Sequence, residues 1–126
     1  MYYKMKFLNR PIAYLQNDDF DSNGVLTNPK IPKNKTVLIM IQAGYCGYCT
    51  QAKPAFQEFA NNNKNIFCAT IQGDGTMPGE QELGKRIKTI SPGFRGYPDY
   101  VKYISGKRVS GDIKGRGVKD LIEFTS

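Results

Sequence analysis

A layered α/β domain built around a mixed β-sheet is the fold class that the sequence predicts, as one domain over residues 1–126. Three observations predict it. The length of 126 residues suits a single core. Two short apolar runs, at residues 36–43 and 66–72, are typical of buried strands and enclose a segment with helical periodicity. A predicted hairpin and an amphipathic segment end the chain, and this alternation of strands and helices favours layers packed on a sheet.

The first third of the chain contains only short predicted elements. Residues 12–15 form a short apolar stretch that predicts a strand. Residues 18–26 start with Asp18 and Asp19, which are common at helix N-termini, so the segment predicts a short helix or an irregular turn. Residues 28–35 are rich in proline and lysine and predict a connector.

The central third predicts a buried strand followed by a helix. Residues 36–43 are β-branched and almost continuously apolar, as a strand covered on both faces should be. From Gly47 the apolar residues recur with helical spacing, and we expect Pro54 to kink this helix because proline lacks the backbone donor. The expected inner face consists of Ala52, Ala55, Phe56, Phe59 and Ala60.

The last part of the chain predicts a strand, a helix, a hairpin and a terminal helix. Residues 66–72 form the strand, residues 73–79 a loop, residues 80–89 the helix and residues 91–98 a second loop. Residues 100–104 and 108–113 form the hairpin around Ser105-Gly106-Lys107, and residues 118–124 form the last helix. The side chains expected to face inward are Leu83, Ile87 and Ile90 in the first helix and Val118, Leu121, Ile122 and Phe124 in the second.

Composition narrows the possible functions. The formal charge of +7 comes from scattered lysines and arginines, which predict a solvated surface with a bias toward acidic protein partners and no nucleic-acid partner. The absence of histidine excludes Cys-His and Ser-His-Asp nucleophiles and removes the commonest neutral metal ligand. The longest apolar run, residues 37–41, is too short to span a bilayer, and residues 1–7 resemble no signal peptide. We therefore expect a soluble cytoplasmic monomer that does not bind membranes.

Cys46 and Cys49 are the predicted catalytic residues. They lie where the buried strand gives way to the helix, and unpaired N–H groups at a helix N-terminus favour the thiolate, which is the nucleophilic form. Residues three apart share a helix face, so Cys49 is expected to attack a mixed disulfide formed at Cys46. This chemistry needs no cofactor and no metal. Cys68, in the middle of a strand, is expected to be a core residue.

The cysteine pair is also compatible with three other kinds of site. A zinc site would need two further ligands, and only Cys68 and carboxylates are available in a chain without histidine. The pair could also bind an iron–sulfur cluster that bridges two chains, or form a permanently oxidised structural disulfide. The position of the pair at a helix start in a chain without an export signal argues against a structural disulfide.

The chain resembles the thioredoxin family over most of its length. The strand at residues 37–43 and the sequence Tyr45-Cys46-Gly47-Tyr48-Cys49 resemble the family's strand, aromatic residue and Cys-Gly-x-Cys motif. Pro54 matches the family's helix proline, and Arg95-Gly96-Tyr97-Pro98 resembles the segment that ends in its cis-proline. Gly106 and Gly115 resemble the glycines of the hairpin turn and of the segment before the last helix.

The resemblance implies a thioredoxin-like three-layer α/β/α fold and the activity of a protein disulfide oxidoreductase, with roles in electron transport and cell redox homeostasis. It implies a cis Tyr97-Pro98 bond beside the sulfurs, with the Tyr97 backbone pairing with an extended substrate segment. The implied substrate-binding residues are Tyr45, Gly47, Tyr48, Tyr97 and Pro98. The implied partners are protein disulfide or dithiol substrates and a reductase or other thiol electron donor.

The sequence departs from the family pattern at three places. Met40 stands where thioredoxins carry a buried aspartate, and Thr70 stands at its usual lysine partner, so the family's proton acceptor for Cys49 is absent. Tyr48 replaces the usual proline between the cysteines, which affects thiolate stability and reduction potential. The loop at residues 73–79 is longer than usual.

Three functions are therefore compared. The first is a general disulfide reductase, and the second is a disulfide-donating oxidase or isomerase with the same two cysteines. The third is a non-enzymatic module that binds a partner protein through Tyr45, Tyr48, Tyr97 and Tyr100. A glutaredoxin-like function is disfavoured because the sequence shows no recognisable glutathione site.

Overall fold

A five-stranded mixed β-sheet forms the centre of the molecule in the computed structural model, which describes residues 7–126. The strands lie in the order β1-β3-β2-β4-β5; β1, β3 and β2 are parallel, and β4 and β5 are antiparallel to their neighbours. Their bounds are β1 Ala13–Tyr14, β2 Thr36–Gln42, β3 Ile66–Gln72, β4 Asp99–Ile104 and β5 Lys107–Val109. The central place of β2 explains why its sequence is apolar on both faces. The prediction that residues 1–7 do not form a signal peptide concerns mainly residues 1–6, which lie outside the described residues.

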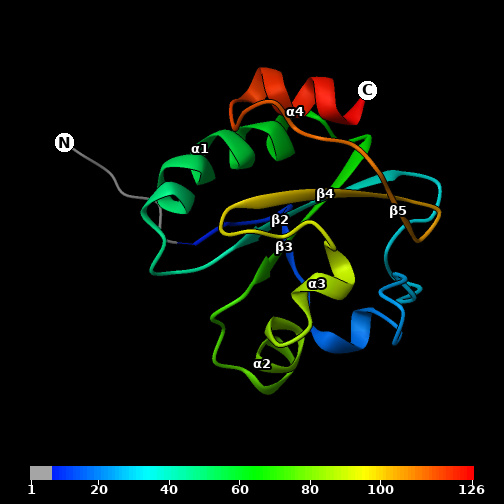
Figure 1. Ribbon diagram of the computed structural model, residues 1–126. Coiled ribbons are helices and arrows are strands. Elements are labelled where there is room, and N and C mark those ends of the chain that lie inside the picture. Colours follow the sequence, from blue (N-terminus) through cyan, green and yellow to red (C-terminus); the bar gives the residue numbers. More distant parts are fainter. Residues whose placement is uncertain (1–6) are drawn as a thin grey trace.

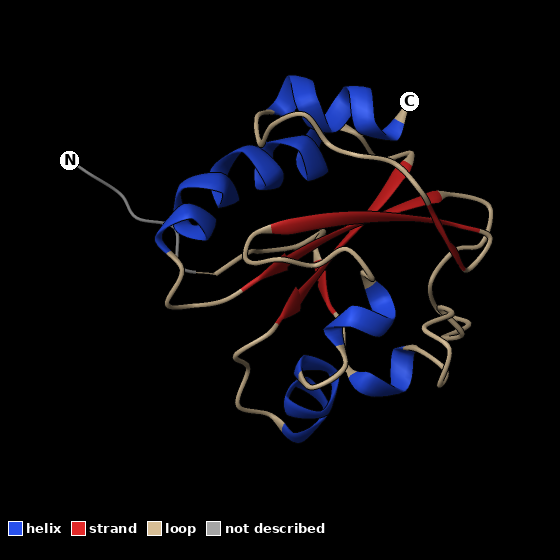
Figure 2. Cartoon of the chain, viewed as in Figure 1, coloured by secondary structure: helices blue, strands red, loops and turns tan. Residues whose placement is uncertain are grey.

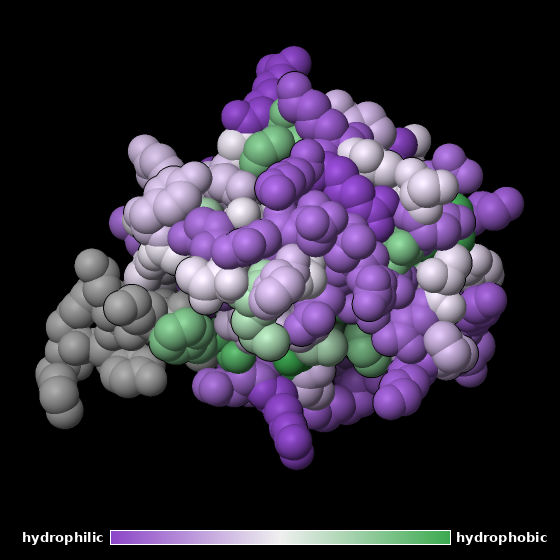
Figure 3. Space-filling view, turned by 90° about the horizontal axis from the view of Figure 1, so that it is seen from below, coloured by the Kyte–Doolittle hydropathy of each residue, from purple (hydrophilic) through white to green (hydrophobic). Residues whose placement is uncertain are grey.

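Helices cover both faces of the sheet and produce three layers (Figures 1 and 2). On one face lie α1 (Gly47–Asn62) and α4 (Val118–Thr125). On the other lie α2 (Pro78–Gly84), α3 (Ile87–Ile90) and the 3₁₀ helix η1 (Asn17–Asp19). Seen from the α2 side, the surface is mostly hydrophilic, with apolar residues in a short band (Figure 3). The predicted three-layer α/β/α architecture is confirmed.

The alternation of side chains along β2 separates two cores. Val37, Ile39 and Ile41 point to the face covered by α2 and α3, whereas Leu38 and Met40 point to the face covered by α1 and α4. All five side chains are at most 3% exposed. At about 25 cal/mol per Å² of apolar surface removed from water, burial on both faces makes β2 a major contributor to stability. This burial also fixes the position of the carboxyl end of β2, from which the chain leads into α1.

The helix predicted at residues 80–89 is divided into α2 and α3, which is a correction to the prediction. The three side chains expected to point inward, Leu83, Ile87 and Ile90, are buried as predicted. The helix breaks next to Arg86, whose guanidinium donates to the Asn17 side chain and to the Asp21 carbonyl, both at 2.7 Å. These bonds join the break to residues more than 60 positions earlier, so local periodicity carries no signal of it.

The second hairpin strand is shorter than predicted. β5 ends at Val109 instead of continuing to residue 113. From Gly111, whose φ is +158°, the chain leaves the sheet edge and packs beside Phe124 of α4. The predicted turn is present: Ser105 and Gly106 both have positive φ, as a two-residue hairpin turn that matches the strand twist requires.

Three further details differ from the sequence expectations. Ile122, expected to face inward, is 48% exposed, whereas Leu121 and Phe124 of α4 are buried and Val118 is half-buried. Ala55 is only half-buried, while Gln57 is buried on α1. The Gln57 amide exchanges hydrogen bonds with the backbone of Asn9, which explains how a polar side chain can be buried at this position.

Residues 18–26 form no regular helix beyond η1. They adopt the irregular turn that the sequence offered as the second possibility, and a β-bridge between Phe20 and Leu26 closes it.

Tyr103 makes a buried hydrogen bond whose removal we expect to destabilise the fold. Its side chain is 0% exposed, and its hydroxyl donates to the Gly24 carbonyl at 2.8 Å. Tyr103→Phe leaves that carbonyl buried without its donor, which should lower the free energy of unfolding by about 1–3 kcal/mol in urea denaturation. Tyr45→Phe, at an exposed ring, is the matched control. A Tyr103→Phe variant as stable as the wild type would contradict this assignment.

Candidate dithiol site

Cys46 caps the N-terminus of α1, at the point where the chain leaves the buried strand β2. Its backbone is extended, with φ −84° and ψ 115°, and its sulfur accepts a hydrogen bond from the Cys49 backbone N–H at 3.1 Å. The first N–H groups of a helix have no partner within the helix, and the positive end of the helix dipole lies there. Both effects stabilise negative charge that develops at this position.

The two cysteines differ in access to solvent. Cys46 is half-buried, whereas Cys49 is 0% exposed, one helical turn further in. Burial, together with a hydrogen bond to Cys46, raises the pKa of Cys49 to about 12. At neutral pH Cys49 is therefore a thiol, and Cys46 is the sulfur of the pair that a large molecule can reach.

Tyr97 and Pro98 lie beside the sulfurs, joined by a cis peptide bond as the family resemblance implied. The Cys46 thiol donates to the Tyr97 carbonyl at 3.5 Å. The Tyr97 ring packs edge-on against Tyr45, with ring centroids 6.2 Å apart, and its hydroxyl approaches Gly73 so closely that a Cβ there would clash. The structure thus brings the two cysteines, Tyr45, Tyr97 and Pro98 together.

Exposed aromatic and basic side chains surround the pair. Tyr45 and Tyr48 are 76% and 65% exposed, and the Arg116 guanidinium lies 5.3 Å from the centroid of the Tyr48 ring. Gly47 is also exposed, and a Cβ placed on it would meet nothing within 4 Å, so the surface above the cysteines is open. Next to Pro98, a cavity of about 240 Å³ is bordered by Lys114 and Arg116.

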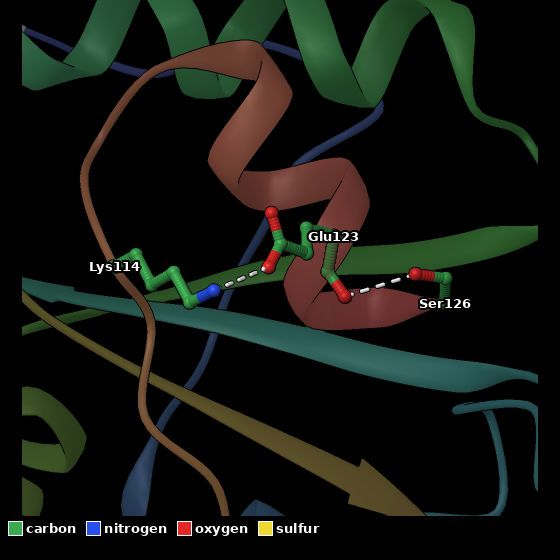
Figure 4. Close-up of polar contacts among 3 residues, drawn as sticks. All are labelled: Lys114, Glu123 and Ser126. Atoms are coloured by element: carbon green, nitrogen blue, oxygen red, sulfur yellow. Dashed lines mark hydrogen bonds and ion pairs between the residues drawn. The ribbon is translucent and has the colours of Figure 1, made fainter.

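The segment that carries Lys114 and Arg116 is anchored to α4. The Lys114 ammonium pairs with the Glu123 carboxylate at 3.0 Å, and the Ser126 hydroxyl donates to the Glu123 carbonyl at 2.9 Å (Figure 4). The hydrogen bond with Glu123 raises the pKa of Lys114. The pair is exposed and contributes little to stability.

Asp74 is a site residue that sequence reasoning missed. Its two carboxylate oxygens accept from the Gly44 backbone N–H at 2.9 and 3.0 Å, which ties the loop after β3 to the loop before Cys46. The sequence drew attention to the unusual length of the loop at residues 73–79, but nothing in it pointed to Asp74. Gly44 is close to this carboxylate, and a Cβ on it would lie 3.2 Å from Asp74 Oδ2.

Lys53 is the second residue that the sequence did not reveal. Its side chain is 1% exposed on the inner side of α1, four residues after Cys49. Below the helix, Met40 and Thr70 occupy adjacent register positions, and the Thr70 hydroxyl donates to the Met40 carbonyl at 2.7 Å. The sequence indicated that a carboxylate is missing at Met40, but nothing in it indicated a buried cation nearby.

Cys68 lies in the core, as predicted, with 3% exposure, and burial raises its pKa to about 12. Within residues 7–126, no three His, Cys, Asp or Glu side chains gather into a cluster that could hold a metal ion. In the same part of the chain, no helix has the length and apolar character needed to cross a membrane.

Similar proteins are found by sequence and by structure. The chain is 42% identical to a thioredoxin-like protein, 453L, of Invertebrate iridescent virus 6, over 97% of both chains. Its fold is similar to that of thioredoxin f2 of Chlamydomonas reinhardtii (TM-score 0.59, 16% identity, 89% of this chain and 92% of that one). It is also similar to thioredoxin f of spinach chloroplast (TM-score 0.63, 18% identity, 94% of both).

A third similar structure is thioredoxin f2 in its complex with ferredoxin:thioredoxin reductase (TM-score 0.63, 17% identity, 89% of both chains). At these identities the three solved structures bear on the fold alone. No protein-family model matches the sequence.

Proposed function

The chain belongs to the thioredoxin-like family, whose fold and neighbouring cysteines support thiol–disulfide oxidoreductase chemistry in general, and we propose that it reduces protein disulfides through Cys46 and Cys49. One observation carries the proposal. The accessible sulfur of the pair caps a helix N-terminus and accepts the Cys49 N–H, while the second sulfur is buried and protonated. This asymmetry suits one nucleophile that attacks from the surface and one that resolves from within.

The proposed reaction has two exchange steps. The Cys46 thiolate attacks one sulfur of the substrate disulfide, which forms a mixed disulfide and releases the other substrate sulfur as a thiolate. Cys49 then loses its proton and attacks the Cys46 sulfur, so that the Cys46–Cys49 disulfide forms and the second substrate sulfur leaves. Two electrons pass from the dithiol to the substrate, and each leaving thiolate takes up a proton.

The surface around Cys46 is the proposed substrate site. An extended segment would pair with the Tyr97 backbone beside Pro98, while Tyr45, Gly47 and Tyr48 form the rim it crosses. Arg116, which lies over the Tyr48 ring and borders the cavity next to Pro98, adds positive charge at one end, which favours substrates with acidic residues near the disulfide. No cofactor takes part in either step.

The oxidised protein needs an electron donor, and we propose a dithiol reductase that approaches the same face. A related fold is known in a complex with ferredoxin:thioredoxin reductase, which supports a reductase as the class of partner. We further propose that the protein works as a cytoplasmic monomer of one domain.

The direction of electron flow is tested by the reduction potential of the Cys46–Cys49 pair. The protein is equilibrated in glutathione buffers, quenched, and analysed by mass spectrometry. We expect a value near that of thioredoxin, about −270 mV. A value near that of protein disulfide isomerase, about −180 mV, would instead make the protein a disulfide donor or isomerase. Failure to form this disulfide at any buffer ratio would overturn the redox function.

A further inference from the structure

Lys53 occupies an unusual position for a lysine. Its side chain is 1% exposed and is among the largest fully buried side chains of the described residues. Lysine is almost never buried without a compensating interaction, because an ammonium ion loses its hydration in the interior. Lys53 lies four residues after Cys49 on α1, and residues four apart are neighbours on one helix face. The charge is therefore placed beside the buried sulfur.

The groups around Lys53 are mainly negative or become negative during the reaction. Burial lowers the pKa of Lys53, while negative charge on Cys49, Asp74 and Cys46 raises it. Cys46 and Cys49 lie on the same helix, and Asp74 lies in the loop after β3. Two tyrosines also interact electrostatically with Cys49: Tyr100 on the facing strand β4 and Tyr97 just before it. Burial raises the pKa of both phenols, so both stay neutral.

The sheet face below α1 adds uncharged polar groups. Gln42 is 0% exposed, and its amide nitrogen and oxygen find no partner among residues 7–126. The alternation of β2 places Gln42 on the same face as Leu38 and Met40, which is the face that α1 covers. The interior under the start of α1 is therefore more polar than the core around Phe56 and Phe59.

The second exchange step needs such a charge. Cys49 must lose its proton to attack. Burial opposes this most, and free Cys46 opposes it further through a hydrogen bond and through charge, whereas a hydrogen bond with the Ala43 backbone and the charge of Lys53 lower the pKa of Cys49. Once Cys46 is bound in a mixed disulfide, its sulfur carries no charge and offers no such bond. Lys53 is then the neighbouring charge that favours the Cys49 thiolate. Met40 supplies no carboxylate that could accept the proton.

We propose that Lys53 is a positioning residue for the second step, a buried cation that stabilises the Cys49 thiolate when Cys49 attacks the mixed disulfide. This inference rests on the proposed function. The proton of Cys49 leaves to solvent or to the departing substrate thiolate, and Lys53 keeps its own proton throughout. Asp74, near the surface, partly balances the cation in the resting protein.

The test is a stopped-flow reaction of the reduced protein with Ellman's reagent at several pH values. Attack by Cys46 releases the first coloured thiolate, and attack by Cys49 on the resulting mixed disulfide releases the second. In Lys53→Met we expect the second phase to slow about tenfold at neutral pH, with its pH profile moved up by about one unit, because a nearby opposite charge is worth about that much. Lys53→Gln should give the same shift and Lys53→Arg the wild-type profile.

The matched control is Lys102→Met. Lys102 is a half-buried lysine on β4, and its ammonium donates to the Phe124 carbonyl at 2.8 Å. The control removes the same charge from the molecule and should leave both phases unchanged. Circular dichroism checks that every variant is folded, and Lys53→Gln, which keeps a polar side chain at the buried position, serves as the second variant should Lys53→Met fail to fold.

The possible outcomes separate the two proposals. Folded Lys53→Met and Lys53→Gln variants with the wild-type pH profile in the second phase would overturn the role of Lys53 and leave the dithiol mechanism standing. A uniform slowing without a shift along the pH axis would likewise overturn it, because that indicates a purely structural effect. A wild-type protein that never releases the second thiolate would overturn the proposed function itself.

Discussion

Replacing Cys46 with serine is expected to abolish disulfide reduction, leaving only the rate at which the donor reacts by itself. The serine hydroxyl is not ionised near neutral pH and cannot replace the thiolate as nucleophile. The measurement is the reduction of the insulin interchain disulfides with dithiothreitol as donor, followed by turbidity. Because the Cys46 side chain is half-buried and the substitution nearly isosteric, the thermal unfolding midpoint should change little, so that a loss of activity reports on chemistry.

The control for this experiment is Cys68→Ser. Cys68 lies in the core, so this variant is expected to be less stable but still active at temperatures well below its unfolding midpoint. A Cys46→Ser variant that kept the biological role of the protein would favour the non-enzymatic module that binds through its exposed tyrosines.

Replacing Cys49 with serine is expected to stop turnover at the mixed disulfide. Cys46 still attacks, because its place at the helix N-terminus is unchanged, but no second sulfur lies within α1 to release the substrate. Incubation with an oxidised protein substrate should therefore give a covalent one-to-one adduct that survives denaturing gels and disappears on treatment with dithiothreitol. In wild-type protein the same adduct should be short-lived.

The same variant identifies the physiological substrates, since adducts formed in cell extract can be purified and sequenced. The required control is the double variant Cys46→Ser/Cys49→Ser, which should form no adduct. Adducts that persist in this double variant would assign the reaction to Cys68, and normal turnover by Cys49→Ser would mean that substrate thiols resolve the intermediate themselves.

Much of the dithiol site could be predicted from the sequence because its signals are local. The apolar run of β2 and the helical spacing after Gly47 place Cys46 at a strand-to-helix junction, and three-residue spacing puts Cys49 one turn further. The family resemblance adds Tyr97 and Pro98, and the structure confirms both their proximity to Cys46 and the cis bond.

The sequence was less informative wherever distant segments meet. The break between α2 and α3 lies where Arg86 donates hydrogen bonds to the segment around Asn17, and β5 ends just before the chain comes close to Phe124 at Gly111. In each case the local pattern is compatible with a longer element. Tertiary hydrogen bonds and packing outweigh the modest intrinsic propensities of a few residues.

Periodicity and spacing are properties of neighbouring residues, so they were enough to predict the layered α/β fold class, the order of the principal strands and helices along the chain, and the pair of cysteines, while the thioredoxin-like family came from the resemblance of the motifs. Two features became evident only in the folded molecule. Asp74 holds the loop before Cys46, and Lys53, which in the sequence looks like one more surface cation, is buried beside Cys49. The physical reason is that the free energy of a charge depends on what surrounds it in space, and its surroundings are assembled from segments far apart in the chain.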